Sequence, residues 1–409
     1  MMGTETRIGL PTAEELCPVA AAEAVTGAYV DTRRHRGAGR TPQTQPKSRE
    51  NPAKRPNSAT ESRPNGNCRL NLFLICVVLG GTLFQLFGMP FVLRGFGMRA
   101  GWVLFPIMLL QPLHWGLIHE AIHSRLLPKR RINEFCARLL SVTHGLPFDA
   151  TRVCHLVHHR FSRHSYDRPD VYDGRGAYAL AWLRYRGRLF GGVYLGLLAS
   201  SLIAFVPVSL GVRLMENAIP IDEEGDTNVR RTFVSLVLNV TKRRRTRREF
   251  AMTLALYGAS AWIYGAWWPM LLAAMYVRGV WHSLADNVAH HAVSLDEPER
   301  ARNYSLPLAF RPLVMNQHLH LTHHRYPSVP WTSLAAMSES EDAQPRGNYF
   351  RAALRQLGQC YPTRISLALK APASYGRDAR GITDPARSPI RHIAPPKEGT
   401  IHGESELHE

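Results

Sequence analysis

Histidine is the residue type whose spacing indicates chemistry in this chain of 409 residues, which contains 19 histidines. On a helix, residues three or four positions apart lie on one face, so histidines with that spacing can direct their imidazoles at one site. Three clusters have this spacing: His119-Glu-Ala-Ile-His123, His155-Leu-Val-His158-His159 and His320-Leu-Thr-His323-His324. One such histidine alone is usually a satisfied polar residue, but convergent clusters of the same ligand type predict a metal centre.

The number of imidazoles indicates which metals the centre would hold. Eight imidazoles exceed the ligands of one four-coordinate zinc ion and suit two transition-metal ions. A nitrogen-rich site with open positions is also the setting of iron-dependent oxygen chemistry, so we expect two iron ions. The predicted ligands from the three clusters are His119, His123, His155, His158, His159, His320, His323 and His324.

Long apolar segments lie beside these clusters. Residues 70–93 and 100–118 are nearly uncharged, and each is long enough to cross the hydrocarbon core of a bilayer, which takes ~20 helical residues. Their short connection runs from Arg94 to Arg99. These two segments are therefore predicted to form a transmembrane hairpin.

The positions of two further apolar stretches depend on the basic run from Lys242 to Arg248. If each stretch crossed the membrane once, this run would lie outside, against the tendency of basic residues to stay in the cytoplasm. We therefore expect spans at 250–266 and 267–285 that turn near Gly265 to Pro269, and an interfacial or re-entrant segment at 190–210. This predicts an all-α integral membrane protein with about four transmembrane helices in two hairpins.

The two hairpins would bring all three histidine clusters to one surface. We expect a cytoplasmic helical cap, formed by residues 119–189 and 286–336, that holds the dimetal site. The predicted localisation is a bacterial inner membrane, with the metal site and both termini on the cytoplasmic side. The expected domains are a disordered tail at 1–67, a membrane domain at 68–336 and a polar tail at 337–409 with one possible amphipathic helix near 349–357.

Charge and cysteine usage narrow the class of partner. The net charge is +18, but the basic residues concentrate beside apolar segments, and we find no zinc-finger or RNA-binding pattern. Nucleic acid is therefore not an expected partner. The six cysteines are scattered and predict no disulfide. Cys154 adjoins His155, but one helical step turns it about 100° away from the ligand face.

A short polar element, Asp286-Asn287-Val-Ala-His290-His291, follows the fourth predicted span. Asn287 and His291 share a helical face because they are four residues apart. Asp286 and His290 have the same interval, so they form a competing register. Either histidine would add one imidazole to the predicted metal centre.

The three clusters resemble the histidine boxes of the integral-membrane fatty acid desaturase and hydroxylase superfamily. The similarity covers about residues 70–334, and the third box lies in NQHLHLTHHRYPSVPW, whose Pro-x-x-Pro-Trp tail is also similar to that of bacterial acyl desaturases and carotenoid-modifying relatives. The resemblance implies that the eight clustered histidines hold two irons. It also implies a ninth ligand, for which Asn287 and His291 match the family's Asn-x-x-x-His element, with Asn287 reaching iron through water.

Other residues are assigned around the predicted centre. Metal-bound histidines usually need partners that orient their second ring nitrogen. The candidates are Glu120, Asp167, Asp170, Asp286, His164 and His318, whereas His114, His144 and His282 are expected to be structural. Residues expected to line an apolar substrate channel are Trp115, Leu117 and Trp281.

The resemblance implies that the reduced irons use O2 to oxidise a methylene of a lipid chain. We find neither a Rossmann glycine fingerprint nor a His-Pro-Gly-Gly element, so the electrons would come from an external ferredoxin or cytochrome b5-like donor with its reductase. The leading hypothesis is a desaturase of a fatty acyl chain, as an acyl-lipid or acyl-thioester. The alternatives are a hydroxylase or ketolase acting on a fatty acid, alkane, sphingolipid or carotenoid, and a metal-binding membrane protein without turnover.

Overall fold

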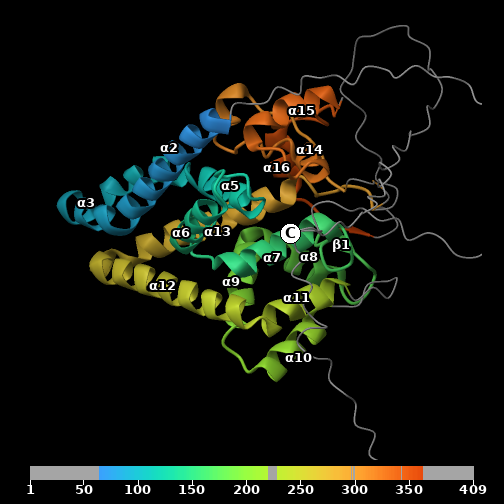
Figure 1. Ribbon diagram of the computed structural model, residues 1–409, viewed down its shortest axis with the longest axis horizontal. Coiled ribbons are helices and arrows are strands. Elements are labelled where there is room, and N and C mark those ends of the chain that lie inside the picture. Colours follow the sequence, from blue (N-terminus) through green and yellow to red (C-terminus); the bar gives the residue numbers. More distant parts are fainter. Residues whose placement is uncertain (1–63, 220–227, 296, 298–299, 342, 363–409) are drawn as a thin grey trace, which may run out of the picture. The chain divides into compact units, whose positions relative to one another are not determined.

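A computed structural model describes residues 64–219, 228–295, 297, 300–341 and 343–362, and this part of the chain is mostly helical (Figure 1). Its only sheet is a parallel pair of two-residue strands, β1 (Val171–Tyr172) and β2 (Tyr361–Pro362). The expected all-α class is therefore confirmed for the described residues. The predicted disordered tail at 1–67 lies outside them except for its last four residues.

Two helical runs at the start of the described chain are long and apolar enough to cross a membrane. The first covers Cys68–Phe96 and the second Met98–Ile122. Gly97 separates them with a φ of 69°, a left-handed conformation that glycine adopts without strain. The turn thus falls inside the predicted connection. The elements of the two runs are α2 (Pro64–Leu83), η1 (Phe84–Gly88), α3 (Met89–Phe96), η2 (Met98–Val103), α4 (Leu104–Met108) and α5 (Gln111–Ile122).

A second helical hairpin consists of α12 (Val240–Tyr264), η4 (Gly265–Trp267) and α13 (Trp268–Val288). Gly265 has a φ of 56° and ends α12, and a proline occupies the first turn of α13, where its missing N–H costs nothing. The turn lies where the sequence places it. Because only the first two runs of the described chain meet the length and apolarity of a span, the crossing of the membrane by α12 and α13 stays a prediction.

Buried hydrogen bonds join the two hairpins near their tips. The Ser260 hydroxyl donates to the carbonyl oxygen of Leu86 at 2.7 Å, and the Tyr264 hydroxyl donates to that of Gln85 at 2.5 Å. Both carbonyls lie in the π-helical turn η1, and Pro90, which has no N–H, cannot donate to either of them. In Figure 1, α3 and the end of α12 extend to the same side of the domain, away from α14 to α16.

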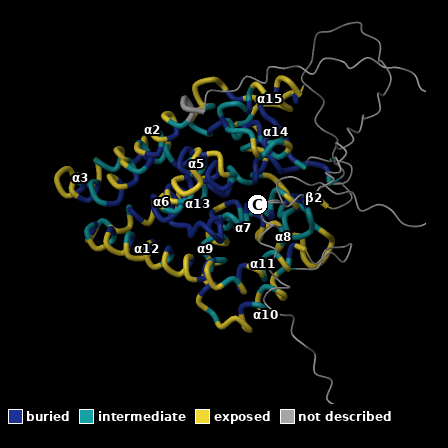
Figure 2. The backbone as a smooth tube through the Cα atoms, in the orientation of Figure 1, coloured by how far each residue is buried: buried dark blue, intermediate teal, exposed yellow. Residues whose placement is uncertain are grey.

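The outer surfaces of both hairpins carry large apolar side chains. Trp102 and Trp262 are each more than four-fifths exposed, and Phe73, Phe91 and Leu254 are at least 60% exposed. Figure 2 shows these exposed faces along α2, α3 and α12. An apolar surface of this extent is costly in water and suits the hydrocarbon of a bilayer.

The segment predicted to be interfacial or re-entrant is interrupted rather than continuous. It contains α9 (Val193–Leu202) and the start of α10 (Val208–Ala218), with Pro207 immediately before α10. Tyr194 of α9 packs against Gly279 of α13, which has no side chain to hinder the approach. Its position relative to a membrane stays a prediction. The neighbouring elements are α8 (Tyr178–Gly187), η3 (Arg188–Gly192) and α11 (Asn228–Leu238).

The remaining helices cover the ends of the hairpins that lie away from their tips. Arg138 of α6 pairs with Asp149 of α7 at 3.0 Å and with Glu249 of α12, so one buried ion cluster ties three helices together. The elements of this cap are α6 (Arg130–His144), α7 (Phe148–Phe161), η5 (Leu308–Phe310), α14 (His320–Arg325), η6 (Trp331–Ser333), α15 (Leu334–Ser340) and α16 (Tyr349–Arg355).

The predicted domain boundary at 336 does not match the structure, because residues 337–362 pack on the domain. Gln356 is fully buried, and its side-chain oxygen accepts a hydrogen bond from Asn287 at 3.0 Å. The segment is polar, but its polar groups have buried partners, which composition alone does not reveal. The possible helix near 349–357 is confirmed as α16. The rest of the predicted tail lies outside the described residues.

Candidate metal centre

Four segments bring nine histidines together. Helix α5 carries His119 and ends at His123, α7 carries the second cluster and α14 the third, and His290 follows the end of α13. The i, i+3 and i+4 spacing works as expected on α5, α7 and α14. The nine imidazoles form two groups, in each of which the possible ligand atoms lie within 4.8 Å of one another.

The first group contains His119, His123, His155, His159 and His323. Its Nε2 atoms face one another: His155 Nε2 lies 3.0 Å from that of His123 and 3.0 Å from that of His159. His159 Nε2 also lies 3.0 Å from that of His323. All three helices that carry histidine clusters therefore contribute to this group.

The second group contains His158, His290, His320 and His324. His158 Nε2 lies 3.0 Å from that of His290, and His320 Nε2 lies 3.2 Å from that of His324. The cluster on α7 is thus divided, with His155 and His159 in the first group and His158 in the second. The cluster on α14 is divided in the same way, so the two groups adjoin through shared helices.

The packing of these nitrogens fits metal ions better than hydrogen bonds. Each nitrogen of a neutral imidazole is either one donor or one acceptor, so it can form only one hydrogen bond, whereas the Nε2 atoms of His155 and His159 each face two others. Two imidazole nitrogens at right angles around an ion with bonds of about 2.1 Å lie about 3.0 Å apart. His119 Nε2 is buried and has no hydrogen-bond partner among the described residues. Both groups therefore fit a bound transition metal.

Burial keeps most of these imidazoles neutral, as metal coordination requires. Burial lowers the pKa of His123 to about 3, with help from the positive charges of Arg152 and Arg125. The pKa of His290 is lowered to about 3 by burial and by the neighbouring His158. The pKa values of His155, His159, His320, His323 and His324 lie well below 6.5, mainly because of burial.

His158 is oriented by a carboxylate. Burial by itself would lower its pKa, but the negative charge of Asp167 and a 2.6 Å hydrogen bond from His158 Nδ1 outweigh that effect and raise the pKa. Asp167 also accepts a hydrogen bond from Arg188 at 3.2 Å. An Nδ1–H held in this way leaves Nε2 free to face the second group. The expected partnership of Asp167 with a clustered histidine is confirmed.

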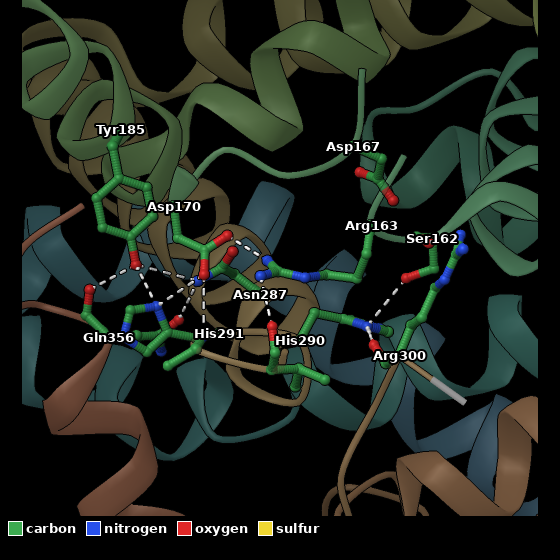
Figure 3. Close-up of polar contacts among 12 residues, drawn as sticks. Ser162, Arg163, Asp167, Asp170, Tyr185, Asn287, His290, His291, Arg300 and Gln356 are labelled. Atoms are coloured by element: carbon green, nitrogen blue, oxygen red, sulfur yellow. Dashed lines mark hydrogen bonds and ion pairs between the residues drawn. The ribbon is translucent and has the colours of Figure 1, made fainter. Parts of the chain in front are cut away.

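Two other orienting contacts were not anticipated from the sequence. His119 Nδ1 lies 3.1 Å from the side-chain nitrogen of Gln317. His290 Nδ1 lies 2.7 Å from the carbonyl oxygen of Arg300 and 3.1 Å from the Ser162 hydroxyl (Figure 3). The sequence offered one signal for Gln317, because it is a polar residue three positions before the third cluster. No feature of the sequence pointed to the backbone carbonyl of Arg300.

The predicted ninth ligand differs from the structure. Figure 3 shows His291 and Asn287 in a separate polar network. His291 Nδ1 lies 3.0 Å from the Tyr185 hydroxyl, and the Asn287 side chain donates to Gln356 at 3.0 Å. Neither residue belongs to a histidine group. The ninth imidazole comes instead from His290, which belongs to the competing register. The reason is that α13 ends at Val288, so the helical i, i+4 rule no longer places residue 291.

The remaining predicted partners have other roles. Glu120 accepts a hydrogen bond from the backbone N–H of Trp331 at 3.2 Å, which ties the first cluster to the Pro-x-x-Pro-Trp tail. Asp170 pairs with Arg163 and accepts from the Ala292 N–H at 2.9 Å. These carboxylates therefore brace the segments that carry the ligands.

Of the two histidines expected to support ligands, His164 packs its ring on Phe161, and the carbonyl oxygen of His318 accepts a hydrogen bond from the Tyr304 N–H. Neither belongs to a histidine group in the described part of the chain.

Two cavities flank the histidine groups, with volumes of about 650 and 750 Å³. Both are lined by Trp115, His155, His282 and Asp286, so they meet beside a predicted metal ligand. Trp115 and Trp281 line the first cavity, as expected for channel residues. Leu117 does not, because it is fully buried in the apolar core.

Two adjoining groups of histidines, brought together by helices beside two cavities, form a site that could hold metal ions. The family model described as fatty acid desaturase matches residues 94–353, more than half of the chain, and the chain belongs to this family. Its members are oxidoreductases that are membrane-associated and typically metal-dependent. No curated protein matches the chain. No solved structure matches it either.

Proposed function

We propose that this protein is an O2-dependent diiron enzyme that introduces a double bond into a fatty acyl chain, carried by a lipid or a thioester. The observation that carries the proposal is the division of nine histidines into two adjoining groups that share α7 and α14. A single ion would need only one such group. Family membership supports oxidation of a lipid chain.

The first group would hold one iron and the second group the other. When bound, the irons supply, with O2, an oxidant able to remove hydrogen from an unactivated methylene. Desaturation converts CH2–CH2 to CH=CH and reduces one O2 to two water molecules, which takes two electrons and two protons from outside. Asp167, Gln317 and the Arg300 carbonyl hold three imidazoles in orientation while this happens.

The two cavities support a long, thin substrate. Both are lined by Trp115 and Asp286 and adjoin His155, so a hydrocarbon chain bound in either cavity would lie beside the proposed irons. Gly196 lines the second cavity, and a Cβ at this position would meet no atom within 4 Å, so the glycine leaves room that a larger residue would fill. A chain drawn from the bilayer would reach this space between helices whose outer faces are apolar.

The electron donor is proposed to be a ferredoxin or cytochrome b5-like protein with its reductase. The support is a group of exposed basic residues just after the first cluster, at Arg125, Lys129, Arg130 and Arg131. An acidic donor would be attracted to them electrostatically. The proposed location is a bacterial inner membrane with the metal centre on the cytoplasmic side, because the basic run at the start of α12 favours that side.

The second candidate is a hydroxylase or ketolase acting on a fatty acid, alkane, sphingolipid or carotenoid. The polar lining of the first cavity, which includes His144, His282 and Arg278, favours a substrate that carries oxygen. Hydroxylation would use the same centre and the same electrons, but one oxygen atom would enter the product.

Expression in a host with saturated and monounsaturated lipids and a compatible donor tests the proposal. Desaturation gives acyl chains two mass units lighter, hydroxylation gives products sixteen units heavier, and His323→Ala abolishes either product because it removes a ligand of the first group. Purified protein that binds iron but consumes no O2 with a reduced donor would contradict both candidates and support a metal-binding protein without turnover.

A further inference from the structure

Polar groups without partners gather at the inner end of the first cavity. His144 and His282 are 1% and 2% exposed, and neither ring nitrogen of either residue has a hydrogen-bond partner among the described residues. The side-chain oxygen of Gln111 is also buried and has no hydrogen-bond partner among the described residues. All three residues line the cavity. Buried polar atoms are nearly always paired, so this concentration indicates a bound partner.

A buried cation lies in the same wall. Arg278 is 1% exposed, and its acceptors are all neutral: the His144 carbonyl oxygen and the Gln85 side-chain oxygen, each at 3.2 Å, together with the Tyr257 hydroxyl and the Thr143 carbonyl oxygen. Its Nε has no partner in the described part of the chain. No carboxylate of the described residues forms an ion pair with it. A guanidinium offers only donors, so this wall favours an oxygen atom of a ligand.

These polar groups lie close to the proposed irons. His119 and His155, both in the first histidine group, line the same cavity. The Trp115 ring lies 4.2 Å from the ring of His282 and 6.1 Å from that of His155, measured between centroids. The unpartnered nitrogens are therefore separated from the metal ligands by about the width of one indole, which spans a few carbon–carbon bonds.

Exposed apolar side chains also lie at the cavity. Its lining includes Trp281, which is 39% exposed, and Val314, whose N–H donates to the Phe310 carbonyl oxygen. Phe310 and Leu308 are exposed beside it, at 45% and 74%. A lipid can reach the cavity past these exposed apolar side chains.

We infer that the first cavity binds a lipid carrying a hydroxyl or carbonyl oxygen within a few carbons of the carbon that is oxidised. This inference rests on the proposed oxidation of a lipid chain at the histidine centre. The oxygen accepts hydrogen bonds from Arg278 and the imidazoles, and a hydroxyl also donates to Gln111. A plain hydrocarbon in the same place leaves the two imidazoles, the Gln111 oxygen and the Nε of Arg278 unpaired, so the cavity discriminates against it.

The experiment measures binding by the iron-loaded protein in detergent micelles. Dodecane, dodecan-1-ol and dodecan-2-one are compared as probes by the rise in the thermal unfolding midpoint at increasing probe concentration. The two oxygenated probes are expected to bind at least about tenfold more tightly than dodecane, which corresponds to about one net hydrogen bond. The stronger of the two identifies whether the cavity prefers a hydroxyl or a carbonyl.

Variants of the cavity residues show which side chains cause the preference for oxygenated probes. His282→Phe and His144→Phe keep a ring of similar size but remove both nitrogens, so each is expected to reduce the preference for oxygenated probes several-fold. His318→Phe is the matched control, because His318 is equally buried, has an unpartnered nitrogen and does not line the cavity. Unchanged iron content in each variant shows that the fold is intact.

Equal binding of the three probes would overturn the inference, and so would a preference that survives in both cavity variants. A different outcome would contradict the proposed function. A protein that binds no iron would contradict the diiron proposal, while probe binding remains measurable in the metal-free form. Desaturation of plain acyl chains without discrimination among the probes would leave the diiron proposal standing and refute the inference.

Discussion

The Nε2 atom of His290 lies 3.0 Å from the Nε2 atom of His158, although the two residues are 132 positions apart in the chain. His158 is held by Asp167, and His290 by the Arg300 carbonyl oxygen and the Ser162 hydroxyl (Figure 3). Each Nδ1 atom is thus engaged away from the contact. Both Nε2 atoms are left to face a metal ion that the second group could hold.

Replacing His290 should therefore reduce the amount of bound iron, whereas replacing its neighbour His291 should not. His290→Ala is expected to lose about one of two irons, because it removes one of four residues from the second group. His291→Ala is the matched control and should retain both, since His291 bonds to Tyr185. Elemental analysis of the purified proteins makes the comparison. Loss of iron in His291→Ala with full retention in His290→Ala would restore the ligand register predicted from the sequence.

Asp167 should increase the affinity of the second histidine group for iron. Asp167→Asn keeps the size of the side chain but removes the charge that orients His158, and such partners are typically worth about 10–100-fold in metal affinity. The expected result is weaker iron binding at unchanged folding, measured by competition with a chelator. Asp173→Asn is the control, because Asp173 is exposed and bonds only within its own turn. Equal affinities in the two variants would show that Asp167 does not act on the metal.

The second cavity should limit access of long chains. A Cβ added at Gly196 meets no atom within 4 Å, and Gly196→Leu narrows the space that this residue lines. Oxidation of a long-chain lipid is expected to fall several-fold, with iron content unchanged. Gly258→Leu on the exposed face of α12 also meets no atom and should leave the rate unaltered. If the two variants oxidise the lipid equally fast, the chain does not use this cavity.

Membrane topology can be tested with single cysteines placed at exposed positions in a background without the native cysteines. Arg245→Cys and Glu339→Cys should be protected from an impermeant thiol reagent in intact cells, because the basic run and the cap are expected in the cytoplasm. Met98→Cys, at the tip of the first hairpin, should react, since Met98 is 72% exposed. Labelling of Arg245→Cys from outside would disprove the two-hairpin topology.

Much of the site follows from local periodicity. The spacing within each of the three clusters places its histidines on one helical face, and the structure has helices at α5, α7 and α14. The apolar runs before His119 are long enough to be recognised without knowledge of any contact. The turn at Gly265 was also predictable, because glycine and a following proline mark the end of one helix and the start of another.

Other features depended on contacts between distant residues. Nothing in the spacing of His155, His158 and His159 divides them between two groups, because that division depends on where α14 crosses α7. The exchange of His291 for His290 follows from the end of α13 at Val288, and helix ends are among the least predictable features of a sequence.

The sequence by itself determined the ligand type, the helices that carry most of the ligands and the apolar segments beside them, because these depend on periodicities of a few residues. Only the tertiary structure decided which imidazoles share an ion and that residues 337–362 belong to the domain. It alone placed His144 and His282 without partners beside the centre. Such pairings join segments far apart in the chain, 69 residues for Asn287 and Gln356 and 132 for His158 and His290, and no local pattern encodes the distance between them.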